Sequence, residues 1–368
     1  MDNSIKIPLN KATITKKDTN NLSKLFDSDF FSAKTEIQFE NKFKNYIKRK
    51  HAVSTNSGTS ALHLALLSLG IKENDEIILP SYTCVALLNA INYVKAKPKL
   101  VDCNFNAENP STGSGQGDFN ISYSDVVKKI TLNTKAIIVP HVFGLPAEID
   151  KIIALGVPVI EDATQSLGGT YLGKKLGSYG LISIFSLHYS KMMTTGAGGI
   201  LLTDSKELID RAKFLADYEF SVIQQRLSPP DDYNIQYNYK MAGLNAALGI
   251  SQLNQLNEFV QKRKKIAKLY DSYFKNTVES PAILKENIFW RYPIKTKKNP
   301  REVIKTSLKY GIELGRGVYP PLHQYLKMPD SLFENTKKAI DSLVVLPIYP
   351  SLTEKEINYL LKIVKKII

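Results

Sequence analysis

The chain has 368 residues, of which 43% are hydrophobic and 23% charged, and its formal net charge is +14 at pH 7. Such a length can bury a sizeable core, and this composition is ordinary for a soluble globular protein. No apolar run reaches the roughly 20 residues that span a bilayer, and the polar start lacks the apolar core of a secretory signal. We therefore expect a cytoplasmic protein of two domains, or of one large domain with a smaller one attached.

The net positive charge has three interpretations. Nucleic-acid binding is disfavoured, because the lysines are scattered and no RNP, zinc-finger or zipper pattern accompanies them. A basic field could instead steer a nucleotide diphosphate into a cleft. A lysine-rich composition spread over solvated faces is the interpretation we prefer.

The cysteines and histidines predict neither disulfides nor a metal site. Cys84 and Cys103 form no CxxC pattern, so a disulfide framework is not expected. The five histidines show neither HExxH nor another paired-ligand spacing, so we predict no bound metal.

Strand and helix signals alternate along the first two thirds of the chain. Residues 1 to about 34 have mixed polarity and are expected to form an arm that packs on the main body. This alternation predicts an α/β fold with a mainly parallel sheet. The expected strands are 51–55, 76–82, 99–102, 136–140, 157–160, 181–187 and 198–203, and the expected helices are 36–48, 61–69, 85–94 and 205–218.

The last third predicts a second, smaller α/β domain. A helical pattern from 246 to about 274 leads into it, followed by a strand at 289–294 that contains the only tryptophan, Trp290, and a helix at 299–310. Thr353 and Glu356 form a capping box for the last helix. We place a large domain at 1–250, including the arm, and a small domain at 251–368.

Two expected strands end in reactive side chains. Asp162 follows the strand at 157–160, while Ser186, His188 and Lys191 lie at the end of 181–187 or just beyond it. Ligands of open α/β sheets bind outside the carboxyl ends of strands, which suggests one shared pocket.

The first turn of the helix at 61–69 is a second candidate site. Thr59 and Ser60 stand immediately before this helix, whose unpaired amide groups suit an anion. An ordinary helix cap is the alternative, and the two roles are compatible.

The motifs EDATQS and SLHYSKMMTTGAGG resemble the DegT/DnrJ/EryC1/StrS family of pyridoxal-phosphate aminotransferases, which act on keto sugars attached to nucleotides. The resemblance covers nearly the whole chain and implies the aspartate-aminotransferase type of fold (fold type I). Several motifs in order are far more specific than any one of them. The others are SGTSAL at 57–62, PSYT at 80–83, YNYKM at 237–241, AALGISQL at 246–253 and LPIYPSLT at 346–353.

The resemblance assigns roles around the cofactor, pyridoxal 5'-phosphate. Lys191 would form its Schiff base and later carry a proton, as a lysine amine can. Asp162 matches the partner of the ring nitrogen, and Gln165 matches the position near the ring hydroxyl. The phosphate would be held by Gly58, Thr59, Ser60 and Ser186, and by Asn238 of a neighbouring subunit, which implies a homodimer with a shared active site.

Other positions depart from the family or point to the substrate. Cys84 stands where many relatives stack an aromatic ring on the cofactor, and it gives a smaller, softer contact. Ala197 and Lys240 also replace commoner residues. The resemblance places His188, His323 and Tyr319 near the substrate. A structural role is an equal alternative for His323, and a hydrogen-bonded loop histidine is the alternative for His188.

The implied reaction has two halves. An amino acid, glutamate by family analogy, would convert the cofactor to pyridoxamine 5'-phosphate, which would then aminate a keto sugar nucleotide of the 4-keto-6-deoxy type for surface polysaccharide or glycan synthesis. Three alternatives stay open: an aminotransferase acting on a small phosphorylated ketone, a non-catalytic cofactor-binding regulator, and, least favoured, a nucleic-acid-binding protein.

Overall fold

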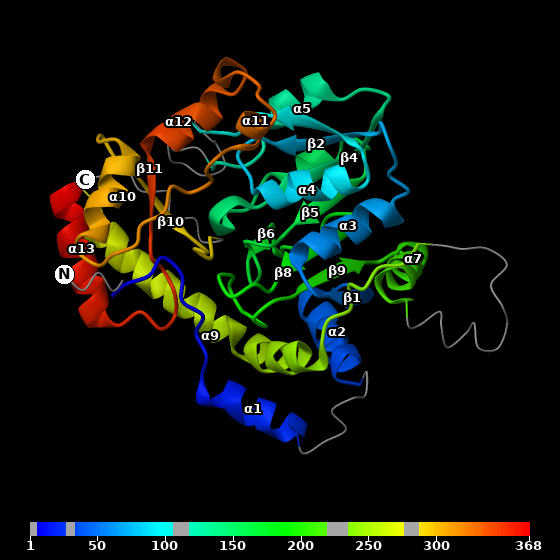
Figure 1. Cartoon of the computed structure of the whole chain (residues 1–368), viewed down its shortest axis with the longest axis horizontal. Helices are drawn as coiled ribbons and strands as arrows, with labels where there is room; N and C mark the ends of the chain where they lie inside the picture. The colour runs from blue at the N-terminus through cyan, green and yellow to red at the C-terminus, as the bar shows by residue number, and fades with distance from the viewer. Residues whose placement is uncertain (1–5, 27–33, 106–117, 219–234, 276–286) are drawn as a thin grey trace.

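The computed structural model describes residues 6–26, 34–105, 118–218, 235–275 and 287–368. Figure 1 shows a central sheet with helices around it and a C-terminal part beyond the far end of the long helix α9 (Gly243–Phe274). Across the described residues, no helix combines the length and apolar character needed to cross a membrane.

The central sheet has seven strands in the order β1-β9-β8-β5-β4-β2-β3. Only β9 runs against its neighbours, so the predicted mainly parallel sheet is confirmed. The carboxyl ends of the other six strands therefore meet at one edge. The bounds are β1 (His51–Thr55), β2 (Glu76–Pro80), β3 (Lys97–Val101), β4 (Thr134–Pro140), β5 (Val159–Asp162), β8 (Ile182–Ser186) and β9 (Gly199–Thr203).

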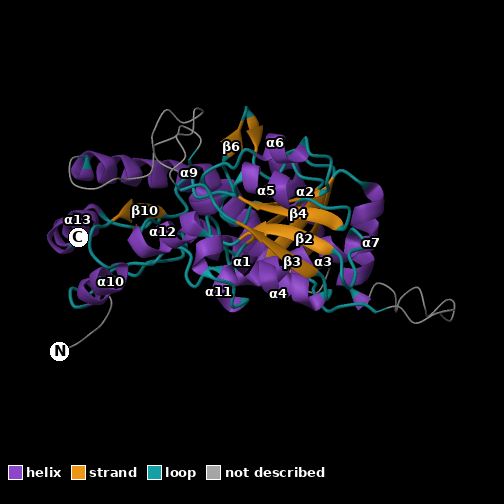
Figure 2. Ribbon diagram, turned by 90° about the horizontal axis from the view of Figure 1, so that it is seen from above, coloured by secondary structure: helices purple, strands orange, loops and turns teal. Residues whose placement is uncertain are grey.

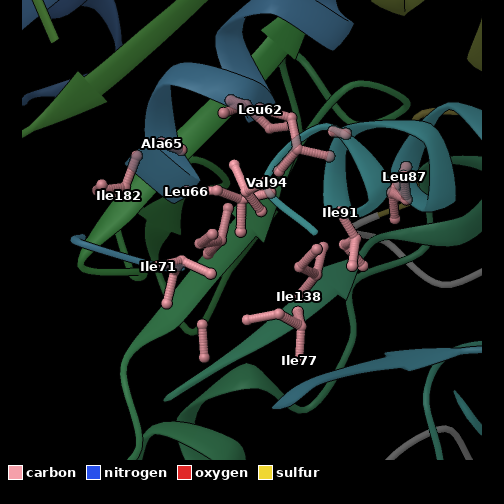
Figure 3. Close-up of a cluster of buried hydrophobic side chains, with 14 of the residues drawn as sticks. Leu62, Ala65, Leu66, Ile71, Ile77, Leu87, Ile91, Val94, Ile138 and Ile182 are labelled. Atoms are coloured by element: carbon pink, nitrogen blue, oxygen red, sulfur yellow. The ribbon is translucent and has the colours of Figure 1, made fainter. Parts of the chain in front are cut away.

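Helices cover both faces of the sheet, as Figure 2 shows from above. Successive strand residues point to opposite faces, and both faces are buried, so the central strands are apolar throughout. In β4, Ile138 packs under α3 and α4, while Ile137 and Val139 pack on the opposite face (Figure 3 shows Ile138 in the first of these clusters). One face carries α3 (Gly58–Ser68), α4 (Val85–Tyr93) and α7 (Lys206–Ala216), and the other carries α2 (Lys34–Ile47), α5 (Tyr123–Lys129), α6 (Ile149–Ile153) and part of α9.

The C-terminal part is built on a two-stranded antiparallel sheet, β10 (Tyr292–Lys295) and β11 (Leu343–Leu346). Its core also takes in the second half of α9. The helices are α10 (Pro300–Leu308), α11 (Leu322–Tyr325), α12 (Glu334–Ser342) and α13 (Glu354–Ile367), with short 3-10 turns η1 (Val142–Gly144) and η2 (Asp330–Leu332) and a small hairpin of β6 (Thr170–Tyr171) and β7 (Lys174–Lys175) elsewhere.

The proposed boundary at residue 250 falls inside a continuous helix. The first half of α9, through Val260, packs in a core with α2 and the large sheet, whereas Ile266 and later residues pack in the C-terminal core. The N-terminal arm bridges both parts: Ile7 pairs with Ile312 in the C-terminal part, and α1 (Lys16–Phe26) lies along α9. The arm thus contacts more than the main body on which we expected it to pack.

Several predicted elements differ in their bounds, and two of these differences affect the site. The strand expected at 157–160 is found as β5 at Val159–Asp162, so Asp162 is its last residue and does not follow it. The strand expected at 289–294 begins only at Tyr292, because Phe289 has φ +53°, a left-handed conformation incompatible with a strand. The side chain of Asn287 accepts the Phe289 N–H and stabilises this turn. As a result, Trp290 and Arg291 lie ahead of the strand. The capping box at the start of α13 is present as predicted.

Candidate active site

A cavity of about 440 Å³ contains most of the predicted site residues. The ends of β1, β5 and β8 lie at the same sheet edge, and segments that follow these strands reach the cavity. The N-terminal turn of α4, which follows β2, contributes one wall. The cavity is lined by seven of the predicted residues: Gly58, Thr59, Cys84, Gln165, Ser186, His188 and Lys191.

The first turn of α3 presents amide groups to this cavity. Ser57 caps the helix, and its hydroxyl accepts the Ser60 N–H at 3.0 Å. Within the described part of the chain, the N–H groups of Gly58 and Thr59 have no hydrogen-bond acceptor, and both residues line the cavity. Two free amides at the positive end of an eleven-residue helix suit an anionic group such as a phosphate.

Glycines let this turn lie directly on the sheet. A Cβ on Gly58 would lie 2.9 Å from the Ser186 Cβ, and a Cβ on Gly199 would lie 2.3 Å from the Ser57 carbonyl oxygen. Both distances are too short for a real side chain. The two glycines therefore bring the amides of α3 beside the Ser186 hydroxyl, where one anion can contact both.

Lys191 lies in the loop after β8, next to Trp290. Its Nζ is 4.6 Å from the centre of the Trp290 ring. Burial lowers the pKa of the Lys191 ammonium, and the positive charge of Arg291 lowers it further, while Asp162 and Cys84 act in the opposite direction. A lowered pKa increases the fraction of neutral amine, which is the form that attacks an aldehyde or accepts a proton.

Asp162 and its neighbour Glu161 serve different purposes. They are successive residues of β5 and so point to opposite faces. Glu161 is fully buried and accepts N–H groups from Gly177, Tyr179 and Gly180, and its partner His141 lies 3.1 Å away. Because these hydrogen bonds satisfy Glu161 on that side, its role is structural.

The Asp162 carboxylate is the one that acts on the site. It is 2% exposed and accepts the Thr164 N–H at 3.0 Å. The negative charge of Asp162 raises the pKa of Lys191. Asp162 is therefore available to stabilise a positive group placed beside the lysine.

Gln165 is oriented by the loop after β4. Its Oε1 accepts the N–H of Phe143 at 2.9 Å, and Phe143 has φ +58° within η1. The side-chain oxygen is thus occupied by the protein, so a ligand in the cavity would meet the amide NH2 group.

Besides Asp162, which acts on the cavity through its charge on Lys191 and is not part of the lining, four predicted residues lie outside the cavity lining of the described chain. The Ser60 hydroxyl donates to Asn56 Oδ1 at 2.6 Å and so belongs to the cap. His323 is fully buried, with its ring nitrogens 2.7 Å from Ser81 Oγ and 2.8 Å from Asp330 Oδ1. The exposed Tyr319 accepts a hydrogen bond from Arg301, and the exposed Asn238 accepts one from Asn56 through its backbone carbonyl. The structure does not bring these four to the cavity of a single chain.

The sequence interpretation missed the wall formed by Trp290 and Arg291. Trp290 Nε1 donates to the Ser190 carbonyl at 2.8 Å, and the Arg291 guanidinium stacks on the Trp290 ring at 4.2 Å. Asn10 of the arm accepts a hydrogen bond from Arg291. The single tryptophan is the one sequence signal for this wall, but the apolar pattern around it predicts a strand instead.

No metal site is evident in the part of the chain that the structure describes, where His, Cys, Asp and Glu form no group of three or more suited to an ion. Ala197, one of the departures from the family pattern, lines the cavity. Lys240 lies elsewhere, 3.5 Å from Asp217.

Comparison with known proteins shows the family of the chain. The model of the DegT/DnrJ/EryC1/StrS aminotransferase family matches residues 12–365. The GDP-perosamine synthase of Escherichia coli O157:H7 is 33% identical over 366 residues, covering 96% of each chain. A UDP-4-amino-4,6-dideoxy-N-acetyl-beta-L-altrosamine transaminase of Campylobacter jejuni is 34% identical over 269 residues, covering 71% of this chain and 68% of that protein.

Solved structures share the fold. Helicobacter pylori PseC, an aminotransferase involved in the biosynthesis of pseudoaminic acid, superposes with a TM-score of 0.84 at 24% identity, covering 97% of this chain and 98% of that one. The predicted fold type is thereby confirmed.

Proposed function

This chain belongs to the DegT/DnrJ/EryC1/StrS aminotransferase family, whose cofactor is pyridoxal 5'-phosphate, and we propose that it transfers an amino group from L-glutamate to a 4-keto-6-deoxy sugar nucleotide. The observation that carries this proposal is the meeting of Lys191, Asp162 and the free α3 amides at one sheet edge. Relatives named for GDP- and UDP-linked sugars support the substrate class.

The residues present fit the cofactor. A phosphate suits the free amides of Gly58 and Thr59 with the Ser186 hydroxyl, because the missing Cβ of Gly58 leaves these groups together. Asp162 supplies the carboxylate that a protonated ring nitrogen needs, and Gln165 has its NH2 group for the ring hydroxyl. Cys84, an exposed thiol at the start of α4, offers a small contact to the ring.

When bound, pyridoxal phosphate supplies an aldehyde for the amino group and a ring that withdraws electrons from the substrate carbon. Lys191 provides the amine that holds the aldehyde and, once released, takes a proton from one carbon and returns it to another. Its lowered pKa suits this role, because the free amine must be neutral to accept a proton. Asp162 keeps a positive charge stable nearby, as a buried carboxylate does.

His188 can act on the sugar side. It lines the cavity three residues before the lysine, and its Nδ1 lies 3.0 Å from Ser190 Oγ. Burial and the charge of Lys191 both lower the pKa of His188, which favours a neutral imidazole able to donate one hydrogen bond and accept another. A neutral hydrogen-bonding group suits a sugar hydroxyl.

The proposal includes a homodimer working in the cytoplasm. Asn238 is exposed, and the side-chain amide of Asn56 donates to its backbone carbonyl at 3.1 Å. An exposed asparagine beside the phosphate turn but outside the cavity of its own chain supports a site that a second subunit completes. Synthesis of a surface polysaccharide or glycan is the proposed role of the product.

The cofactor step can be tested directly. The purified protein, incubated with pyridoxal phosphate, should show a visible absorption band that borohydride reduction converts to a stable adduct on Lys191, and Lys191→Ala should show no adduct. With glutamate as the amino donor, GDP- and UDP-linked 4-keto-6-deoxyhexoses would then be compared with a small phosphorylated ketone as amino acceptors. Amination of the small ketone alone would reject the sugar nucleotide, and a colourless protein would reject catalysis.

A further inference from the structure

Arg291, a half-buried residue, brings a positive charge to the cavity. Its guanidinium lines the cavity beside Lys191, and burial lowers its pKa to about 10, so it remains protonated at neutral pH. No carboxylate of the described chain lies within ion-pair distance of it, although the charge of Glu313 acts on it from further away. A second guanidinium, Arg263, adds positive charge nearby, since the charge of Arg291 lowers the Arg263 pKa.

The surrounding contacts fix the orientation of Arg291. Its planar group stacks on the Trp290 ring, and Asn10 accepts one of its N–H bonds. Trp290 is itself held by the Ser190 carbonyl through Nε1 and by the Phe143 carbonyl through its backbone N–H. A guanidinium has five N–H donors, so this arrangement leaves donors for a ligand in the cavity.

The position of Arg291 near Lys191 indicates which kind of anion it could bind. Both cations lie close to the same ring, with Lys191 Nζ at 4.6 Å and Arg291 Cζ at 4.2 Å from its centre. In an amino acid, the α-carboxylate is bonded to the same carbon that carries the reacting nitrogen. In a 4-keto sugar nucleotide, the sugar ring separates the reacting carbon from the nearest phosphate. Because the charge of Arg291 also acts on the Lys191 amine, the guanidinium is suited to an anion bonded directly to the reacting carbon, as the α-carboxylate is.

We propose that Arg291 is the receptor for the α-carboxylate of the amino donor. The geometry favours a paired hydrogen bond between the guanidinium and the two carboxylate oxygens, a pairing that planar guanidinium groups make well. Arg291 thereby restricts the donor to amino acids. This inference rests on the proposed transamination, in which an amino acid is the first substrate.

The test uses the holoenzyme and glutarate, a dicarboxylate without an amino group. Because Trp290 is the only tryptophan of the chain, its fluorescence reports on this cavity alone, and calorimetry gives an independent binding constant. Arg291→Gln should weaken glutarate binding about 10- to 100-fold, the loss expected for a charged hydrogen-bonded pair. Arg291→Lys keeps the charge without the planar fork and should lie between wild type and Arg291→Gln. Arg211→Gln, an exposed arginine on α7, should bind as wild type.

GDP and UDP are titrated into the same variants to separate the two anions. Their binding should be unaffected by Arg291→Gln. Unchanged glutarate binding in Arg291→Gln would overturn the inference, as would a variant that loses GDP or UDP and keeps glutarate. Absence of glutarate binding in the wild type would also overturn it.

A separate assay tests the donor. The cofactor spectrum of the wild type should change on addition of L-glutamate, in proportion to its conversion to the pyridoxamine form. If glutamate fails while glutarate binds through Arg291, the glutamate proposal falls and the carboxylate site stands. If glutamate reacts and Arg291→Gln binds glutarate normally, the reaction stands and the assignment of Arg291 is wrong.

Discussion

The two walls of the cavity are built by different means. The sheet wall, formed by Gly58, Thr59, Ser186 and Lys191 with the charge of Asp162 acting on the lysine, consists of strand ends and of the residues that follow them. The opposite wall, formed by Trp290 and Arg291, precedes a strand and depends on a left-handed residue, Phe289, and on Asn10 from the other end of the chain. The parallel sheet thus fixes the position of the sheet wall, while long-range contacts shape the wall of Trp290 and Arg291.

The strongest test of the sheet wall is Asp162→Asn. An asparagine still accepts the Thr164 N–H but lacks the charge, so we expect transamination to fall about 100- to 1,000-fold, the usual effect of losing one prearranged electrostatic group. Both half-reactions should slow, which single-turnover absorbance measurements would show. Unfolding of the cofactor-free variant serves as the control and should match wild type, and activity within a few fold of wild type would contradict the role of Asp162.

A second test concerns how closely α3 lies on the sheet. Gly58→Ala places a Cβ 2.9 Å from the Ser186 Cβ, so the turn must move and its amides separate from the Ser186 hydroxyl. We expect cofactor affinity to fall about 10-fold or more, in line with the loss of one or two charge-assisted hydrogen bonds. Gly243→Ala is the matched control, because its Cβ would make only an ordinary contact of 3.6 Å with Glu36. Equal cofactor dissociation constants for the two variants would argue against a phosphate at α3.

The sequence could predict the sheet wall because its signals are local. Apolar runs ending in Asp162 and Ser186 give the strands and their polar ends, and parallel pairing then brings those ends together. Trp290 and Arg291 carry no such signal. Their place depends on the turn at Phe289 and on a hydrogen bond from Arg291 to a residue 281 positions away, which no periodicity encodes.

The place of His323 also depends on contacts between distant segments. Beside two prolines in a family-like segment, it was an equal candidate for substrate contact and for structure. Only the folded chain shows that Ser81, Asp330 and the parallel Phe333 ring, 4.7 Å away, surround it completely. Burial of a side chain between distant segments is a tertiary property that sequence spacing does not report.

A third prediction follows for His323→Phe. Phenylalanine can keep the stack on Phe333 but lacks both nitrogens, so the buried Ser81 hydroxyl loses a partner. The free energy of unfolding should fall by about 1 to 3 kcal/mol, the range for an unsatisfied buried polar group. Denaturant titration would measure this loss. The KM for the sugar substrate should stay at the wild-type value, and a large rise in KM without loss of stability would restore His323 to the substrate site.

The smallest expected effect is a shift in the pKa of Lys191, which depends on charges from both walls. The charge of Arg291 lowers this pKa and that of Asp162 raises it. Only the neutral amine attacks an aldehyde, so the rate at which cofactor-free protein captures pyridoxal phosphate should rise with pH as Lys191 loses its proton. Arg291→Gln removes a nearby positive charge and raises the pKa, which moves this rise to higher pH. Asp162→Asn should move this rise to lower pH, and Arg291→Lys should leave it nearly in place.

The rate of cofactor capture, measured across a pH series, should shift in opposite directions in Arg291→Gln and Asp162→Asn. A shift of the same sign in both variants would show that these two charges do not control the pKa of Lys191.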